Sequence, residues 1–206
     1  ADIWTEDITV RKDSVSFIAL SRDKQMAHFT VNMLGSHNVQ NMLAAVLAAK
    51  ELGMSLEEIA LAAKSIKQQQ AGITLKSGIN GINIIDSSYS SNPDGVMADL
   101  EYLKIFSGKR IIIMPCLIEL GNTASETHYY IGKKIAQVCD LAIITTKDKF
   151  EDIKRGAVES GMKESNIIFS ENPRDIFTLL ETFKNKSDAV LLEGRVPSEL
   201  ISFLKK

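Results

Sequence analysis

Three short polar clusters carry the side chains of this sequence that could bind or activate a ligand. They are residues 35–41, residues 86–95, and residues 119–121 together with His128. In the first cluster, asparagine offers a donor and an acceptor side by side, which matches the edge of an adenine ring. The second cluster is dense in hydroxyls and amides. These residue types predict recognition of a polar ligand, since no Ser-His-Asp arrangement and no paired-carboxylate spacing is present.

Each cluster also has a simpler interpretation. Residues 35–41 could be a helix N-cap with a polar first turn. Residues 86–95 could be a turn rich in Ser, Asn and Pro, with Pro93 leading into a helix capped by Asp94. Glu119 and His128 could be ordinary solvated side chains. The positions of these clusters in the fold therefore have to decide between the two interpretations.

Two common nucleotide-binding motifs are absent from the sequence. A phosphate-binding P-loop requires G-x-x-x-x-G-K-[ST], and the segments around Lys109 and Lys133 lack the upstream glycine and the hydroxyl residue. The strand-like residues 82–85 are not followed by G-x-G-x-x-G either. The chain is therefore not a standard nucleotide site by itself.

The first 72 residues predict a small antiparallel meander followed by two helices. Strand-like stretches at 8–10, 15–18 and 28–31 are separated by turn-like residues. A helical period runs from Asn38 to Gly53. Ser55 and Glu58 form a capping box for a helix over residues 56–67. The polar run 67–70, followed by Ala71 and Gly72, predicts a linker and a domain boundary.

From residue 73 the pattern alternates between short apolar strands and helices. We expect strands at 82–85, 111–114, 141–145, 167–169 and 189–192, and helices at 96–106, 125–138, 150–160, 175–183 and 198–204. Such alternation predicts an α/β domain, Rossmann-like and doubly wound, with a mainly parallel sheet. Ligands bind beyond the carboxyl ends of the strands in such sheets. The loops 86–94, 115–123 and 193–197 are therefore the expected ligand loops.

Composition limits the class of protein. The chain has 206 residues, of which 45% are hydrophobic and 24% charged, and a net charge of −2. This balance argues against an electrostatic grip on nucleic acid or anionic membrane. No apolar stretch reaches the length of a membrane span, and the acidic first residues do not form a secretory leader. Cys116 and Cys139 lack metal-type spacing and are expected to be small apolar packing residues. We expect a cytoplasmic protein, and the start at Ala1 suggests a fragment of a longer one.

The three clusters, in this order, resemble the Mur ligases. Residues 35–45 are similar to the G-x-H-N-x-x-N-x-L-A-A segment of that family. Residues 84–94, I-I-D-S-S-Y-S-S-N-P-D, are similar to its I-I-D-D-S-Y-N-A-N-P-D loop. Residues 118–121, I-E-L-G, with His128 match its L-E-L-G…H pattern. Within the family the resemblance is strongest to the members that add D-alanyl-D-alanine to a UDP-N-acetylmuramoyl tripeptide.

The resemblance implies an ATP- and Mg²⁺-dependent amide ligase that proceeds through an acyl phosphate. Residues 1–72 would be the end of its central ATPase domain, a partial α+β fragment, and residues 73–206 its carboxy-terminal Rossmann-like domain. Its P-loop, catalytic residues and metal ligands would lie upstream of Ala1, so the chain alone should not hydrolyse ATP. The implied ATP-binding residues are His37, Asn38, Asn41, Asp86, Ser87 and Tyr89. The implied substrate-binding residues are Ser90, Asn92, Pro93, Glu119 and His128.

The implied partners are a UDP-linked muramoyl peptide and a D-amino-acid dipeptide, with a monomeric full-length enzyme and no nucleic acid or membrane insertion. The chain departs from the family pattern at Ser87, where a second acidic residue is usual, and at Ile73, where an arginine is usual. Asp86 could replace the missing acid. Two alternatives remain open: a folylpolyglutamate synthase-like ligase of the same superfamily, and a non-catalytic binding module that has lost ATP chemistry.

Overall fold

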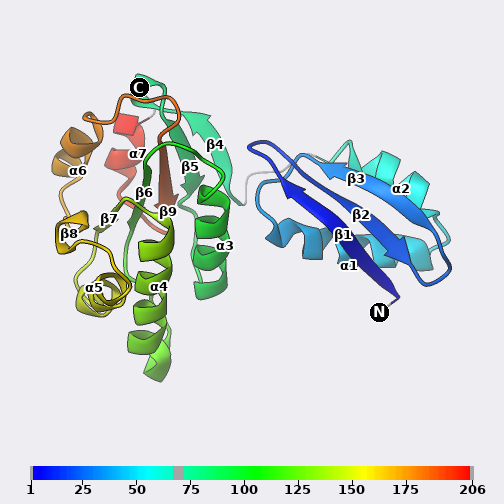
Figure 1. Cartoon of the computed structure of the whole chain (residues 1–206), viewed down its shortest axis with the longest axis horizontal. Coiled ribbons are helices and arrows are strands. Elements are labelled where there is room, and N and C mark those ends of the chain that lie inside the picture. Colours follow the sequence, from blue (N-terminus) through cyan, green and yellow to red (C-terminus); the bar gives the residue numbers. More distant parts are fainter. Residues whose placement is uncertain (1, 67–71, 205–206) are drawn as a thin grey trace. The chain divides into compact units, whose positions relative to one another are not determined.

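The computed structural model describes residues 2–66 and 72–204. The chain divides into two compact units, unit 1 (Ala1–Gly72) and unit 2 (Ile73–Lys206) (Figure 1). The expected linker, residues 67–70 and Ala71, lies outside the described residues. None of the described helices has the length and apolar character that a membrane crossing requires.

Unit 1 is a three-stranded antiparallel sheet covered by two helices (Figure 1). The strands β1 (Ile3–Val10), β2 (Val15–Ser21) and β3 (Met26–Val31) pair in chain order, which confirms the predicted meander. Alternate residues of β2 and β3 are buried, as expected for a sheet with one covered face. The helices α1 (His37–Glu51) and α2 (Leu56–Ala63) share one hydrophobic core with that face.

The capping box of α2 is formed as the sequence predicts. The Ser55 hydroxyl accepts from the Glu58 amide, and the Glu58 carboxylate accepts from the Ser55 amide at 2.8 Å. The helix ends at Ala63, before the predicted end. Its last turn tightens, because the amides of Lys64 and Ser65 donate to carbonyls three residues back.

Replacing Ser55 with alanine should lower the free energy of unfolding by about 1 kcal/mol, because the Glu58 amide loses its capping hydroxyl and the Glu58 carboxylate loses a hydrogen-bond donor. Denaturant-induced unfolding measures the change. Ser36→Ala is the matched control, since Ser36 occupies the same position before α1 but makes no side-chain cap bond. Equal losses in the two variants would contradict the prediction.

Unit 2 is a six-stranded sheet in the order β4-β5-β9-β6-β7-β8. Its strands are β4 (Thr74–Ser77), β5 (Asn83–Ser87), β6 (Arg110–Met114), β7 (Leu141–Ile144), β8 (Ile167–Phe169) and β9 (Ala189–Glu193). The strands from β5 onward pair in parallel, and β4 pairs antiparallel with β5. The mainly parallel α/β sheet predicted from the sequence is thus confirmed. The edge strand β4 is the element that the prediction missed.

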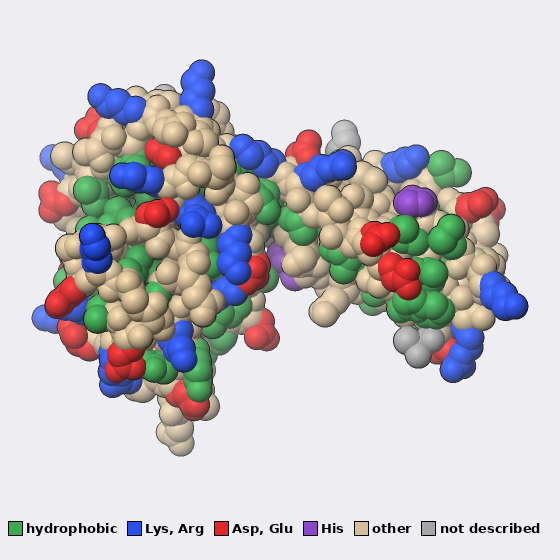
Figure 2. All heavy atoms as spheres, in the orientation of Figure 1, with side chains coloured by type: hydrophobic (Ala, Val, Ile, Leu, Met, Phe, Trp, Pro, Cys, Tyr) green, Lys and Arg blue, Asp and Glu red, His purple; other side chains and the backbone are tan. Residues whose placement is uncertain are grey.

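Five α-helices connect and cover the strands of this sheet. They are α3 (Pro93–Leu103), α4 (Ala124–Val138), α5 (Phe150–Glu159), α6 (Pro173–Leu180) and α7 (Ser198–Leu204), with single 3-10 turns at Ile79–Gly81, Gly121–Thr123 and Glu164–Asn166. One face of the sheet packs against α6 and α7 around a core that includes Ile113, Val190 and Leu200. The helices α3, α4 and α5 pack against one another in a separate layer, as expected of a doubly wound domain in which right-handed crossovers put helices on both faces of the sheet. On the face shown in Figure 2, basic and acidic side chains of unit 2 are interspersed.

Candidate functional site

Three loops of unit 2 meet at the carboxyl edge of the sheet, where the parallel strands end. The strands β5, β9 and β6 are neighbours, so the loops that follow them emerge side by side. The Gly194 amide donates to the Ser87 carbonyl at 3.1 Å. Gly194 has a φ of +66°, and a Cβ there would lie 2.7 Å from Ser91 Oγ and 3.5 Å from Pro115. Glycine at this position therefore lets the three loops approach one another.

Asp86 is held on both carboxylate oxygens. Its Oδ1 accepts from the Ser88 hydroxyl at 2.6 Å, and its Oδ2 accepts from Lys76 Nζ at 2.9 Å. Partial burial acts to raise the pKa of Asp86, but the bonds from Ser88 and Lys76 outweigh it, and the pKa lies below its usual value. The carboxylate is therefore ionised. A sugar hydroxyl or a phosphate-bound cation would have to share it with these two protein groups.

The rest of this loop presents exposed side chains. Tyr89 is 77% exposed, and Ser90 and Asn92 are also exposed. The Asn92 side chain caps α3 by accepting from the Gly95 amide at 2.9 Å, and Pro93 is the first helical residue. The expected cap, Asp94, lies in the first turn instead, because Pro93 takes the first helical position and the cap is therefore Asn92, two residues before Asp94. Tyr89 and Ser90 are thus free to contact a ligand at this edge.

The loop after β6 contains a strained residue. Glu119 is exposed and has a φ of +63°, in the left-handed region that non-glycine residues rarely adopt. Such backbone conformations concentrate at binding and catalytic sites, because the surrounding structure must hold them in place. The strain at Glu119 therefore favours the functional interpretation of this loop over the interpretation as a solvated surface residue.

His128 is fully buried, which contradicts the solvated interpretation. Its Nε2 accepts from the Leu117 amide at 2.9 Å, and its Nδ1 lies 2.6 Å from the Ala124 carbonyl, so Nδ1 carries the proton. Burial lowers the pKa of His128, so the ring is neutral. Both nitrogens serve the backbone of the segment that contains Glu119. His128 therefore positions this loop, and a substrate could reach it only by displacing one of these bonds.

Cys116 fastens the same loop to the one after β7. The Cys116 amide donates to Thr146 Oγ1 at 2.8 Å, and the Lys149 amide donates to the Cys116 sulfur at 3.3 Å. Cys116 is buried, as expected of a small packing residue, and its sulfur in addition takes part in the hydrogen bonds that join the two loops. Cys139 is buried as well, and burial raises the pKa of its thiol.

The first polar cluster lies in unit 1, at the start of α1. The Asn38 side chain is buried, donates to the Leu34 carbonyl at 2.7 Å and lies 3.1 Å from His37 Nε2. Asn41 Nδ2 donates to Asn38 Oδ1 at 3.2 Å. The three side chains form a connected chain that orients the exposed Asn41 amide.

This chain leaves one buried nitrogen without a partner. Asn38 donates to His37 Nε2, which places the His37 proton on Nδ1. Among the described residues, Nδ1 has no hydrogen-bond partner, although it is buried. Ser36 makes no side-chain cap bond, and Asn38 reaches backwards instead. The helix-cap interpretation is therefore wrong, since no side chain of this cluster caps α1, and the buried donor of His37 needs an acceptor that the described residues do not supply.

Two acidic residues that the sequence patterns did not single out lie buried beneath the loops of unit 2. Glu193 ends β9 with 1% of its surface exposed, and Asp99 on α3 is 5% exposed. Both could have been suspected from their patterns. Glu193 directly continues the apolar run of β9, and Asp99 stands on the apolar face of α3, between Val96 and Leu100.

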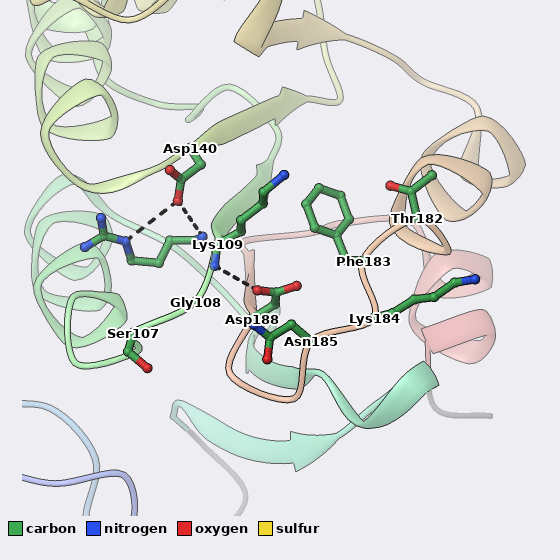
Figure 3. Close-up of a pocket in the computed structure, with 10 residues that line it drawn as sticks. Ser107, Gly108, Lys109, Asp140, Thr182, Phe183, Lys184, Asn185 and Asp188 are labelled. Atoms are coloured by element: carbon green, nitrogen blue, oxygen red, sulfur yellow. Dashed lines mark hydrogen bonds and ion pairs between the residues drawn. The ribbon is translucent and has the colours of Figure 1, made fainter.

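A cavity of about 540 Å³ lies at the opposite edge of the sheet, where β6 and β9 begin (Figure 3). The carboxylates of Asp188 and Asp140 accept from the backbone amides of Lys109 and Arg110, at 2.8 and 2.9 Å. The Lys109 ammonium lies over the Phe183 ring, and the Lys184 side chain points away from it (Figure 3). The carboxylates at this edge thus bind neighbouring loops to one another.

The residues of this chain do not assemble a metal site of their own. Within residues 2–66 and 72–204, no three His, Cys, Asp or Glu side chains converge as metal ligands. The ligand-facing groups of the candidate site are instead hydroxyls, amides, Tyr89 and Glu119.

Comparison with known proteins matches residues 73–196 to the family model described as Mur ligase, glutamate ligase domain. The UDP-N-acetylmuramoyl-tripeptide–D-alanyl-D-alanine ligase of Bacillus subtilis is 22% identical over 197 residues, covering 90% of this chain and 43% of that protein. MurF from Acinetobacter baumannii superposes with a TM-score of 0.83 at 21% identity, covering 98% of this chain and 44% of that one. MurF ligase from Thermotoga maritima in complex with ADP gives a TM-score of 0.79 at 22% identity, with 98% and 45% coverage.

This chain thus spans less than half the length of these relatives. The family model covers well over half of the chain, including all of β5, β6 and β9 and the loops that meet at their ends. The chain therefore belongs to the Mur ligases, and residues 73–196 form the glutamate ligase domain of that family.

Proposed function

We propose that the full-length protein carrying this chain is an ATP-dependent amide ligase that joins D-alanyl-D-alanine to a UDP-N-acetylmuramoyl tripeptide. One observation carries the proposal: the domain matched to the Mur ligases brings its three polar loops together at the carboxyl edge of the sheet. The printed activity of the Bacillus subtilis relative supports the choice of substrates. Unit 1 would be the end of the central domain, and unit 2 the carboxy-terminal domain.

Amide formation from a carboxylate requires activation, because the carboxylate oxygen is a poor leaving group. ATP would supply the activation as an acyl phosphate, with Mg²⁺ held by residues outside this chain. The role of this chain would be to bind and orient the substrates. Two anionic substrates and an amine must be held in line and shielded from water. A chain with these residues alone should neither bind Mg²⁺ tightly nor hydrolyse ATP.

In unit 1, the proposed nucleotide contacts are His37, Asn38 and Asn41. The exposed Asn41 amide would meet the adenine edge, since Asn38 already orients it. The buried Nδ1–H of His37 would donate to an acceptor on the nucleotide. Asn38 would act behind them, because its own polar atoms are bonded to Leu34, His37 and Asn41.

In unit 2, Asp86, Ser87 and Tyr89 are proposed to contact the ribose and phosphates. The exposed Tyr89 ring is the part of this group that is most available to a ligand. Ser90, Asn92, Pro93 and Glu119 are proposed to line the place of the peptide substrates. His128 is proposed as a positioning residue for the Glu119 loop and not as a direct contact.

The cellular setting follows from this chemistry. UDP-linked precursors are made in the cytoplasm, so we propose a cytoplasmic enzyme that acts as a monomer. We propose no nucleic-acid partner and no membrane insertion, in keeping with the net charge of −2.

The full-length protein should release ADP only when UDP-N-acetylmuramoyl tripeptide and D-alanyl-D-alanine are both present. Asn41→Ala should raise the KM for ATP about tenfold, the effect of one lost hydrogen bond worth about 1.4 kcal/mol. Gln40→Ala, the neighbouring amide on the same helix, is the control and should change KM less than twofold. A coupled assay of ADP release measures both.

Different amine acceptors distinguish the alternatives. ADP release with folate and glutamate, but not with D-alanyl-D-alanine, would move the protein to the folylpolyglutamate branch. ATP binding without release under any of these conditions would favour the non-catalytic module.

A further inference from the structure

Two buried carboxyl groups contact each other beneath the three loops of unit 2. The side chains of Glu193, at the end of β9, and Asp99, on the neighbouring helix α3, lie close enough to interact. Only 1% of Glu193 and 5% of Asp99 is exposed. An ionised carboxylate can only accept hydrogen bonds, so two carboxyl groups can bond to each other only if one carries a proton.

No cation is among the groups of the described residues that act on Glu193. Within the described residues, Asp99 is the charged group that acts on Glu193. On the flanking strands, Glu193 lies beside Ser87 of β5 and next to the end of β6 at Met114, and neither residue carries a charge. Burial first, and the charge of Asp99 second, raise the pKa of Glu193 to about 10. Glu193 Oε2 is buried and has no hydrogen-bond partner among the described residues, so no donor stabilises a negative charge on it.

The pair connects the elements from which the loops arise. Glu193 directly precedes Gly194, whose amide donates to the Ser87 carbonyl and whose position would bring an added Cβ against Ser91 and Pro115. Asp99 stands on α3, which begins at Pro93, immediately after the polar loop. A bond between these two side chains therefore fixes the start of α3 relative to the end of the central strand.

We propose that Asp99 and Glu193 share one proton, and that this hydrogen bond positions the loops 87–92 and 194–197 at the carboxyl edge. The two residues act through the loops and touch no ligand, so they are positioning residues. The inference deepens the proposed function by naming what holds its loops, but it concerns the protein alone and does not depend on the identity of the ligand.

The pH dependence of the free energy of unfolding should reveal the proton that the pair shares. The pKa of Glu193 is higher in the folded state than its ordinary value of 4.5, so the folded protein holds a proton that the unfolded chain releases. The stabilisation is complete below about pH 4.5 and is lost progressively as the pH rises towards 10. Relative to Glu193→Gln, the melting temperature of the parent chain should fall by about 3 °C per pH unit between pH 5 and 9. Glutamine keeps the donor and cannot ionise, which makes it the matched control.

Loop positioning should follow the hydrogen bond and not the side-chain volume. Glu193→Gln retains a donor to Asp99, whereas Glu193→Met has similar length but no donor. Hydrogen–deuterium exchange at pH 7 should leave residues 87–92 and 194–197 as protected in Glu193→Gln as in the parent chain. In Glu193→Met, exchange in both loops should rise about tenfold or more.

Several results would overturn the proposal. Parallel pH profiles of the parent chain and Glu193→Gln would exclude the shared proton, and equal loop exchange in the two variants would exclude positioning through the bond. Stabilisation of the parent chain by 1 mM Mg²⁺ at pH 8, absent in Glu193→Gln, would show that a bound cation takes the place of the proton.

If Glu193→Met does not fold, the side-chain carboxyl ¹³C signal of Glu193 in the parent chain tests the proposal. It should not titrate between pH 4 and 8, and a midpoint near 4.5 would refute the proposal. None of these results depends on ligase activity.

Discussion

Gly132→Ala is expected to unfold unit 2 under conditions in which the parent chain remains folded. The helices α4 and α5 cross at two glycines, Gly132 and Gly156. A Cβ on Gly132 would overlap the carbonyl oxygen of Ile153, and a Cβ on Gly156 would overlap that of Tyr129. Backbone atoms in a packed helix cannot turn aside as a flexible side chain can, so the helices would have to separate.

The expected loss is about 3 kcal/mol or more for either alanine variant, at the upper end of the effect of overpacking a core. Urea-induced unfolding followed by circular dichroism measures it. Gly95→Ala on α3 is the control, since its Cβ would meet its nearest neighbour, Asn92 Oδ1, at 3.5 Å. Alanine favours a helix over glycine, so the control should be neutral or slightly stabilising. Wild-type stability in both Gly132→Ala and Gly156→Ala would mean that α4 and α5 are not in close contact.

His128→Leu is the second substitution with a large expected effect, at about 3 kcal/mol. The leucine leaves the Leu117 amide and the Ala124 carbonyl without their partner, and each unpaired buried group costs about 1–3 kcal/mol. The loop that contains Glu119 should become more exposed to proteolysis. His28→Leu is the control: this histidine is exposed on β3, so its loss should change the free energy of unfolding by less than about 0.5 kcal/mol.

The pH dependence adds a second signature of His128. Burial holds the pKa of His128 below its ordinary value of 6.5, so the unfolded chain takes up a proton before the folded one. Stability is therefore complete above about pH 6.5 and falls as the pH drops towards the lowered folded pKa. His128→Leu should lack this component. If the difference between the two unfolding free energies does not change from pH 7 to pH 5, His128 is not buried as a neutral ring.

The elements of unit 2 could be predicted because its central strands are short continuous apolar runs, such as residues 111–114, between helices with clear ends. The edge strand β4 could not. Its residues Thr74–Ser77 are half-buried or exposed and have no apolar run, and they become a strand only by pairing with β5. Helix ends differ from the predicted ones where local hydrogen bonds end the helix before its apolar pattern does. The tightened last turn of α2 is an example.

The candidate site could be predicted in part. Strand order places the loops 87–92 and 115–121 at one edge, and the alternating pattern implied that edge. The burial of His128 could not be predicted, since it depends on how α4 packs on the sheet. The Asp99–Glu193 pair could not be predicted either. The two residues are far apart in the sequence, and only tertiary packing excludes water from both.

The place of β9 in the sheet has a consequence for the order of assembly. This last strand lies between β5 and β6, which do not pair with each other, so the sheet is divided until residues 189–193 arrive. The contacts of β9 with β5 span about half of the chain, and such distant pairings form slowly. A chain emerging from the ribosome would hold two separate sheet fragments until residues 189–193 are released. The insertion of β9 thus closes the sheet, and the loop cluster at its edge is completed only in that step.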